Sequence, residues 1–366
     1  MVGAAFSLGS RKLRPEYLAE LVLNHGPVRP SWTILSHVHG GRSYSRCWNL
    51  LGVGPMNGAI SLIPTDSADG VEPWALTDPW GVAIPVGATQ TMGVQEALNI
   101  WGDTKGKYGS HLEIAGCCAQ NSESADYATL HLQTTVTIPP TIGGYIRCSG
   151  SVIWEFDQTD ATDGLVIESQ EDLFLDLQHI VNYSGQGTAV RFAPSIGVPF
   201  DNIAAIWQCD IRLGEVYASN AAATGLMFDI GKASILNNRI VVRVIDGTGS
   251  RGLVVSNGNG TSVFQQNLLD LGWIEAWSKG QVWIGNSSRM NDWRMSGVSL
   301  SSGSGPGIDT HGNGDNFNVA LDNNNGGTGR GLIFRANSAN NTYLIRGGAK
   351  SWVQDLSGGK NKNLGL

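Results

Sequence analysis

The chain has 366 residues, of which 49 are glycine and 15% are charged. Its formal net charge of −7 argues against a nucleic-acid partner, because phosphate contacts require clustered Lys and Arg. No apolar run approaches the ~18 residues of a membrane-spanning helix, so we expect no membrane span. The low charge and the high glycine content favour a fold with many tight turns, where positive φ is needed.

Residues 1–88 differ in composition from the rest of the chain. Four tryptophans are mixed with Gly and Pro in an irregular sequence, which follows a short helix predicted over residues 15–25. We therefore predict a small N-terminal domain that packs on a partner or on the rest of the chain. Within it, His37 and His39 could share one face of a strand and join a metal site. An ordinary strand or loop explains them as well, since no third ligand is at motif spacing.

The first residues and the cysteines indicate where the chain folds. The N-terminus does not read as a secretory signal, because its Lys and Arg follow rather than precede a short apolar stretch. The five cysteines are an odd number with no C-x-x-C spacing, so we expect reduced, partly buried thiols. Both features favour folding in the cytoplasm of a cell.

The segment TQTMGVQEALNIW, residues 89–101, has the pattern of an amphipathic helix. Val94, Ala97, Leu98 and Trp101 recur at i, i+3, i+4 and i+7 and would therefore lie on one face. We predict a helix over residues 94–101.

From Gly164 to Gly348 the sequence repeats a short unit. A small residue, usually Gly, opens each unit, and an apolar-x-apolar strand follows it. The mean step between units is (332 − 165)/6, about 28 residues, with a second strand-like run in between. Several short strands per turn predict a parallel β-helix, in which stacked coils supply the core. The inward-facing first apolar residues are Leu165, Val190, Leu226, Leu253, Val282, Ile308 and Leu332.

This recurrence and the preceding helix resemble the right-handed parallel β-helices of the pectate-lyase superfamily, especially bacteriophage tailspikes and related virion fibres. The resemblance covers roughly residues 90–349. It implies an all-β, right-handed single-stranded β-helix over residues 89–349. The remaining residues 350–366 are rich in Gly, Asn and Lys, so we predict a flexible tail there. The resemblance also makes residues 94–101 a cap, which the terminal coil requires because its strand edge and apolar interior would otherwise be open.

The resemblance also implies a function. A protein of this kind would be a homotrimeric tailspike or tail fibre of a virion, assembled in the host cytoplasm. It would contact host cell-surface polysaccharide and dock on other virion proteins through residues 1–88. The superfamily includes hydrolases and lyases as well as proteins with no known catalysis, so a polysaccharide depolymerase on the same β-helix is the alternative. A secreted carbohydrate enzyme is disfavoured by the missing signal and by the N-terminal domain.

Glu168 and Asp229 are the candidate catalytic pair. Both immediately follow a strand of the repeat and belong to one outward column, two coils apart. At about 4.8 Å per coil they are roughly 10 Å apart, near the upper limit of ~9.5 Å for the acid and base of inverting glycosidases. Two solvated carboxylates would look the same. The 36-residue step from Val190 to Leu226 could also insert a bulge and spoil the register.

His311 is the third candidate catalytic residue. The run DTHGNGD, residues 309–315, loosely resembles the histidine-glycine element of polygalacturonases. Thr310 departs from that pattern, and no adjacent aspartate pair accompanies it elsewhere. A Gly/Asn/Asp turn explains the run as well.

An acidic stretch before the first unit could bind Ca²⁺ through oxygen ligands, as clustered carboxylates do in lyases of the superfamily. Its spacing is not a motif and fits a turn, so we assign no metal and no cofactor. The residues concerned are Glu155, Asp157, Asp160 and Asp163.

The second residue of each strand should point outward, yet most of this column is apolar. Such a stripe marks an interface, and three chains about a common axis would bury it. A loop of the same chain is the alternative cover. The stripe, interrupted by Arg191 and Asp309, consists of Val166, Met227, Val254, Trp283 and Ile333.

Several tryptophans lie in the repeat region. Exposed aromatic side chains stack on sugar faces, but packing in a core or an interface explains most of them. The residues are Trp207, Trp273, Trp277, Trp283 and Trp293.

Overall fold

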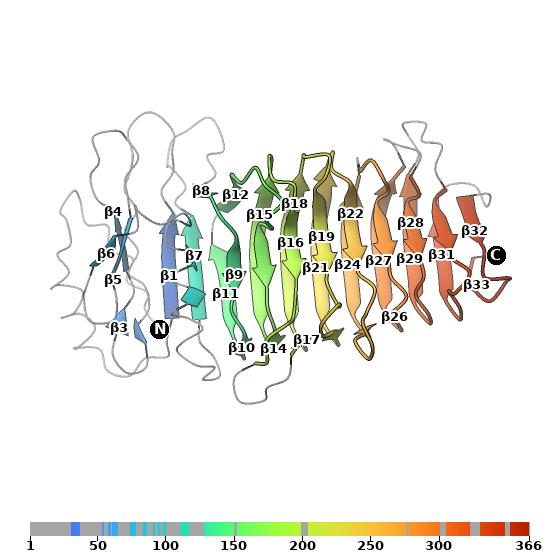
Figure 1. Ribbon diagram of the computed structural model, residues 1–366, viewed down its shortest axis with the longest axis horizontal. Coiled ribbons are helices and arrows are strands. Elements are labelled where there is room, and N and C mark those ends of the chain that lie inside the picture. Colours follow the sequence, from blue (N-terminus) through green and yellow to red (C-terminus); the bar gives the residue numbers. More distant parts are fainter. Residues whose placement is uncertain are drawn as a thin grey trace.

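Short strands joined by turns make up almost all of the structure (Figure 1). The computed structural model describes residues 128–149, 152–198, 204–275, 277–300, 305–322, 330–347 and 352–365, with shorter pieces at 31–36, 53–54, 58–59, 61–64, 74–77, 83–85, 91, 94–95, 98–99 and 111–116. No helix in these ranges is long and apolar enough to cross a membrane.

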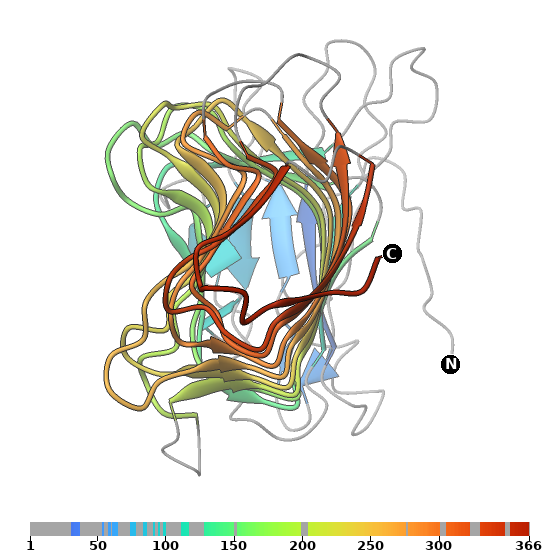
Figure 2. The same ribbon diagram turned by 90° about the vertical axis from the view of Figure 1, so that its right-hand side faces the viewer.

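Three parallel sheets run along the molecule, and the end-on view shows the chain winding from one to the next around a central core (Figure 2). Sheet I contains β9 (Val136–Ile138), β13 (Leu165–Ile167), β16 (Thr188–Phe192), β19 (Thr224–Phe228), β22 (Arg251–Val255), β25 (Val282–Ile284), β28 (Ile308–Thr310), β30 (Leu332–Phe334) and β32 (Val353–Asp355). Sheet II contains β10 (Thr141–Ile142), β14 (Gln170–Glu171), β17 (Ala205–Trp207), β20 (Ser234–Leu236), β23 (Phe264–Gln265) and β26 (Ser288–Arg289).

Sheet III is the longest and has the longest strands. Its members are β1 (Ser31–Ser36), β7 (His111–Gly116), β8 (Ala128–Leu132), β11 (Tyr145–Ser149), β12 (Val152–Phe156), β15 (Phe174–Asn182), β18 (Asp210–Ala218), β21 (Arg239–Gly247), β24 (Leu268–Ile274), β27 (Asp292–Ser299), β29 (Asn316–Asp322), β31 (Thr342–Arg346) and β33 (Lys362–Asn363). Neighbouring strands in all three sheets are parallel and one coil apart, so the predicted parallel β-helix is confirmed.

The predicted inner column is also confirmed. Leu165 pairs with Val190, Val190 with Leu226, and the pairing continues through all seven residues to Leu332, each of them fully buried. Val136 and Val353 extend the column by one coil at each end. The alternation works because successive side chains of a strand point to opposite faces, which puts the two apolar residues of each apolar-x-apolar unit inside.

Aromatic side chains form a second continuous file in the core. Ring centroids lie 4.8 Å apart for Phe192 and Phe228, 4.9 Å for Phe228 and Phe264, and 5.8 Å for Phe264 and Trp293. Trp277 and Trp293 are fully buried and belong to the core. By contrast, Trp207, Trp273 and Trp283 are half-buried, so three of the five tryptophans reach the surface.

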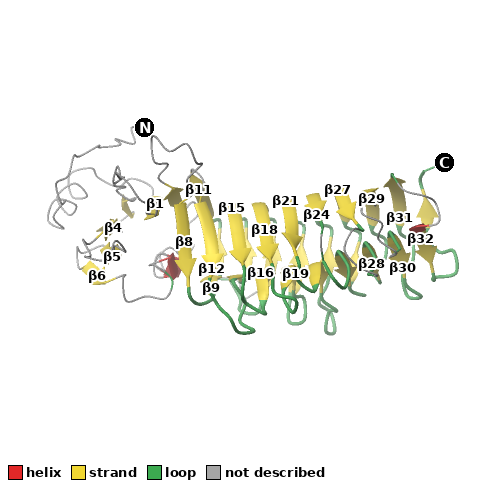
Figure 3. Ribbon diagram, turned by 90° about the horizontal axis from the view of Figure 1, so that it is seen from above, coloured by secondary structure: helices red, strands yellow, loops and turns green. Residues whose placement is uncertain are grey.

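A helical segment covers the start of sheet I, as predicted. Residues 94–95 and 98–99 are helical (Figure 3). Val94 and Leu98 are fully buried in the core. The Gln95 amide donates to the Thr137 carbonyl at 2.9 Å and accepts the Thr137 backbone N–H at 2.6 Å. Gln95 therefore takes the place of a preceding strand on the open edge of β9, which would otherwise expose unpaired backbone groups.

A buried ladder of amides, which the sequence prediction missed, lines the turn between sheets II and III. Each side-chain oxygen accepts the backbone N–H of the preceding rung, at 2.9 Å from Cys209 to Asn238 and 3.0 Å from Asn238 to Asn267. The residue before each rung except Asn361 has positive φ, for example 55° at Gln208 and 54° at Asn237. The rungs are Cys209, Asn238, Asn267, Asn291, Asp315, Asn341 and Asn361.

Both ends of the solenoid extend past the predicted limits. β32 and β33 pair with β30 and β31, so strands continue beyond residue 349 into the segment predicted to be a flexible tail. At the other end β1 pairs in parallel with β7 and so joins sheet III, although it lies within the predicted N-terminal domain. The remaining strands there are antiparallel: β2 (Val53–Gly54) with β3 (Gly58–Ala59), and β4 (Ser61–Pro64), β5 (Trp74–Thr77) and β6 (Ala83–Pro85). His37 and His39 lie outside the described residues.

Cys148 and Cys209 are free, buried thiols, as predicted for part of the cysteine set. Burial raises the pKa of both to about 12, so neither forms a reactive thiolate near neutral pH.

Candidate functional site

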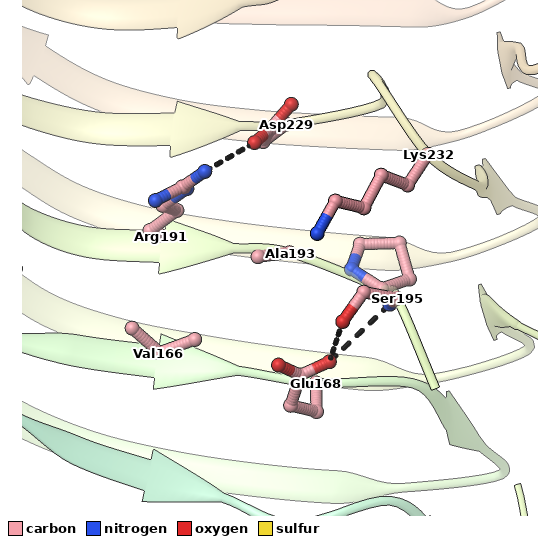
Figure 4. Close-up of a pocket in the computed structure, with 8 residues that line it drawn as sticks. Val166, Glu168, Arg191, Ala193, Ser195, Asp229 and Lys232 are labelled. Carbon is pink, nitrogen blue, oxygen red and sulfur yellow. Dashed lines mark hydrogen bonds and ion pairs between the residues drawn. The ribbon is translucent and has the colours of Figure 1, made fainter. Parts of the chain in front are cut away.

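A hollow of about 180 Å³ opens on the outside of the solenoid, where sheet I ends and the connection to sheet II begins (Figure 4). Both members of the predicted catalytic pair line it, one coil to either side of Ala193. Because Ala193 has a small side chain, it leaves a recess between the two carboxylates. The lining residues are Val166, Glu168, Arg191, Ala193, Pro194, Ser195, Asp229 and Lys232.

The backbone holds Glu168 and Asp229 in one register. The Ala193 N–H donates to the Ile167 carbonyl and the Asp229 N–H donates to the Phe192 carbonyl, both at 2.8 Å, so the ladder continues without a bulge. The extra residues of the 36-residue step lie instead after β16, in the connection of residues 193–204. This connection brings Pro194 and Ser195 to the rim of the hollow.

Glu168 is held by that connection. Its Oε2 accepts the backbone N–H of Ser195 at 3.2 Å and the Ser195 hydroxyl at 3.0 Å. The carboxylate therefore has a defined orientation, with one oxygen bound to Ser195.

Asp229 is held by a cation. Arg191 Nη2 donates to Asp229 Oδ2 at 2.5 Å, while Oδ1 accepts from the Gly231 N–H at 3.0 Å and the Ser256 hydroxyl at 3.2 Å. Burial alone would raise the pKa of Asp229, but these donors and the Arg191 charge lower it below its ordinary value. Asp229 is therefore ionised at neutral pH.

Arg191 is the residue whose role the sequence analysis missed, since it was read as a break in the apolar stripe. Its Nη1 donates to Asp163 at 2.8 Å, so the guanidinium bridges two carboxylates. Its Nε is buried without a hydrogen-bond partner among the described residues. Lys232 is exposed, and Figure 4 shows its amine directed into the hollow. Two cations and two carboxylates thus share the lining, which is balanced in charge.

His311 does not join this site. It lies in the same outward column as Asp229, three coils further along, and its ring packs against Trp283 at a centroid distance of 5.9 Å. Burial lowers the pKa of His311; Asp309 opposes this effect and Arg335 adds to it. The structure therefore groups Glu168 with Asp229 and separates His311 from both.

The column of the apolar stripe is continuous in sheet I. Val166, Met227, Val254 and Trp283 are half-buried, while Ile333 is 9% exposed. The two polar members are neutralised within the chain, because Arg191 bridges Asp163 and Asp229, and Arg335 binds Asp309 through two contacts of 2.6 Å. Val166 belongs both to the stripe and to the hollow, so the two features adjoin.

The acidic stretch of residues 155–163 does not gather around one point. Asp163 binds Arg191, and Asp160 Oδ1 accepts the Thr162 N–H at 3.1 Å, which closes a turn. Within the part of the chain that the structure describes, no group of three His, Cys, Asp or Glu residues could hold a metal ion.

Known proteins give no further guide to this site. The sequence matches no protein-family model, and neither a curated protein nor a solved structure matches it.

Proposed function

We propose that the chain is a carbohydrate-contacting spike of a virion, whose hollow beside sheet I holds one unit of a host cell-surface polysaccharide. The observation that supports this most is the hollow itself: oriented, ionised donors and acceptors around a small recess on a rigid scaffold. Sugar hydroxyls donate to carboxylates and accept from Lys and Arg, so a charge-balanced lining suits a hydroxyl-rich ligand. The volume of about 180 Å³ is below the ~300 Å³ of pockets for drug-sized ligands, which favours a single sugar unit.

The virion part of the proposal rests on fold. A parallel β-helix with a helical cap resembles phage tailspikes and virion fibres of the pectate-lyase type, which favours assembly in a host cytoplasm and docking through residues 1–88. The homotrimer is supported by the stripe. Its apolar side chains lie in one column and its two charged members are already paired, so a neighbouring chain would not have to leave a charge unpaired.

A polysaccharide depolymerase is the second candidate, because two carboxylates line one hollow in register two coils apart. Asp229, ionised by Arg191, would activate water, and Glu168 would protonate the leaving oxygen. If this candidate is right, Glu168→Gln and Asp229→Asn each abolish the release of reducing ends without a large change in melting temperature.

Filling the hollow tests the proposal without touching its polar groups. Ala193→Gln places a longer side chain in the recess, and Ala222→Gln, in an exposed turn, is the matched control. The probes are capsular polysaccharide and lipopolysaccharide from a panel of bacterial strains, scored by surface binding and by new reducing ends or 4,5-unsaturated uronates. We expect Ala193→Gln to lose the binding that the wild type and Ala222→Gln show. Equal binding by all three chains would refute a role for the hollow.

A further inference from the structure

The outer face of sheet III changes character where its strands bend. The pairing of β15 with β18 and of β18 with β21 skips Gln178, Gly214 and Arg243, so inward residues are three apart there instead of two. A Cβ at Gly214 would lie 2.3 Å from the Gln178 carbonyl oxygen, so only glycine fits this close approach. The strand segments after the bend form a separate surface, which we call the second half of sheet III.

Two outward columns cover this surface. One runs through His179, Glu215, Val244, Trp273 and Gly297, each paired with the next. The other runs through Val181, Tyr217 and Asp246, and Glu275 continues it, since its N–H donates to the Ile245 carbonyl at 3.2 Å. The surface thus carries two aromatic side chains, Tyr217 and Trp273, and three carboxylates, Glu215, Asp246 and Glu275.

Trp273 leans along this surface over the next strand. A Cβ at Gly297 would lie 2.0 Å from Cε3 and 2.3 Å from Cζ3 of the indole, so its six-membered ring occupies the space above Gly297. Glycine at this position is therefore what allows Trp273 its orientation. An indole that leans over a sheet and remains half-buried presents a broad apolar surface beside polar neighbours, the arrangement that stacks on the apolar face of a pyranose ring.

Polar acceptors lie beside that indole. Glu275 follows it by two residues on the same side of the sheet, and Asp246 is one coil away. Two coils from Trp273, or roughly 10 Å along the axis, Tyr217 meets Tyr183 edge-on with centroids 5.5 Å apart. Tyr183 is 51% exposed. An elongated ligand parallel to the axis would thus contact an aromatic side chain at both ends, with Asp246 between them and Glu215 and Glu275 level with the two rings.

The negative charge of the second half of sheet III favours a neutral ligand over an anionic one. Burial raises the pKa of Asp246, and the nearby negative charges of Glu275 and Glu215 raise it further. The histidine of the surface is bound to Glu215, with Nδ1 and Oε2 2.9 Å apart. Like charges on three copies of the chain would repel, which disfavours self-association here, and phosphate or uronate groups are disfavoured for the same reason. Hydroxyl groups of a neutral sugar can donate to all three carboxylates.

We propose that the second half of sheet III binds a neutral pyranose oligosaccharide that lies along the solenoid axis and stacks on Trp273. The inference rests on the proposed contact with glycans and adds to it a second surface, on a different sheet from the hollow, and a ligand class. The two surfaces lie on separate sheets of one rigid scaffold, so a polysaccharide chain can be held at either one independently.

The test measures binding of neutral hexasaccharides of glucose, galactose, mannose and N-acetylglucosamine, at millimolar concentration, by saturation-transfer NMR and calorimetry. Trp273→Ala removes the ring, and Gly297→Ala displaces it while keeping the tryptophan. We expect each variant to bind about tenfold more weakly than the wild type, as loss of one aromatic contact implies. Leu268→Ala, an outward apolar change on the same strand, should bind like the wild type.

The outcomes separate this inference from the proposed function. If Ala193→Gln retains hexasaccharide binding while Trp273→Ala loses it, the second half of sheet III is the site, whatever the hollow does. If Trp273→Ala and Gly297→Ala bind as the wild type does, or if the wild type binds none of the hexasaccharides, the inference is overturned. It is also overturned if Trp273→Ala changes the assembled mass and leaves sugar binding intact, because the surface is then an interface between copies. Melting temperatures confirm that each variant is folded.

Discussion

Sheet I and the second half of sheet III carry their outward charges in opposite ways. Asp229 and Asp246 are half-buried aspartates of the same coil, yet the pKa of Asp229 is lowered and the pKa of Asp246 is raised. Burial acts in the same direction on both. The difference comes from the groups in neighbouring coils: Arg191, with the Gly231 N–H and the Ser256 hydroxyl, lowers the pKa of Asp229, whereas Glu275 and Glu215 add to the rise at Asp246. In a solenoid the residues of the adjacent coils are fixed neighbours, so the sign of their charge sets the direction in which they shift the pKa of each carboxyl.

The same contrast distinguishes the outer face of sheet I, which is suited to association with another chain, from the second half of sheet III, which is suited to contact with solvent. Sheet I has an apolar column whose charges are paired inside the chain, whereas the second half of sheet III carries three carboxylates, of which Glu215 is bound by His179. The four predictions that follow test this comparison, beginning with the largest expected effect.

A charge placed in the stripe should dissociate the assembly. Trp283→Asp puts a carboxylate into the proposed seam of sheet I, where an unpaired buried charge costs several kcal/mol. The chain mass is 38.9 kDa, so light scattering distinguishes a trimer from a monomer. Trp273→Asp is the matched control on sheet III and should leave the mass unchanged. A wild-type monomer at micromolar concentration, or an intact trimer of Trp283→Asp, would contradict the interface.

Asp315 extends the comparison to the interior, where no cation among the described residues binds the carboxyl. It replaces asparagine in the amide ladder, accepts from Asn291 N–H at 2.8 Å and from the Ser288 hydroxyl at 2.8 Å, and is fully buried. Burial raises its pKa from 3.8 to about 6. Because the folded state holds this proton more tightly, its contribution to stability is complete below pH ~4 and is lost as the pH rises through ~6.

Asp315→Asn should therefore raise the free energy of unfolding by up to about 3 kcal/mol at pH 8, which is the pKa difference expressed as energy, and change it little at pH 4. Thermal melts across this pH range measure the effect. The converse variant Asn291→Asp should create the same pH dependence one rung earlier. An Asp315→Asn protein that is less stable at every pH would show that the carboxylate is needed by the ladder.

Removing the Arg191 charge should shift the pKa of Asp229 upward, as the pKa of Asp246 is shifted in sheet III. Arg191→Met leaves Asp163 and Asp229 facing each other without a positive charge, so the pKa of Asp229 should rise above its ordinary value. The loss of stability at pH 7 should be about 1–2 kcal/mol, reduced by screening because the Arg191 side chain is 36% exposed. The loss should shrink as acid protonates the two carboxyls. Carbon-13 titration of Asp229 is the direct measurement, and an unchanged pKa would contradict the role given to Arg191.

The smallest effect is expected from relieving the repulsion on sheet III. Glu275→Gln removes the charge beside Asp246 and keeps the shape of the side chain, so the pKa of Asp246 should fall toward its ordinary value while stability changes by under ~1 kcal/mol. Carbon-13 titration again measures it. Glu171→Gln, on sheet II, is a control that should leave Asp246 unaffected. If Asp246 does not respond to Glu275→Gln, the Glu275 charge does not contribute to its raised pKa.

The core residues of this molecule could be predicted from the sequence because the patterns that identify them are local. Alternation within three residues places Leu165 and Ile167 in the core, and the helical spacing of Val94 and Leu98 identifies the cap. The amide ladder also left a signal in the sequence, because Asn238, Asn267 and Asn291 recur at steps of 29 and 24 residues. In the structure each of them follows a residue with positive φ. The ladder was overlooked because a repeated asparagine next to a turn is also what an ordinary loop contains.

Which outward side chains meet on the surface of the solenoid was decided by tertiary structure. The local sequence does not indicate which of the three connections in a coil contains the extra residues of a long step, because insertion into any of them leaves the strands unchanged. Because the extra residues lie in a connection and not within a strand, Glu168 and Asp229 stay in register. Because that connection follows β16, Ser195 reaches Glu168. Partners such as Arg191 and Asp229 are 38 residues apart, and Trp273 and Gly297 are 24 apart. The sequence by itself therefore determined the solenoid and its inner column, whereas the stacking of coils decided which charges meet and where a ligand can bind.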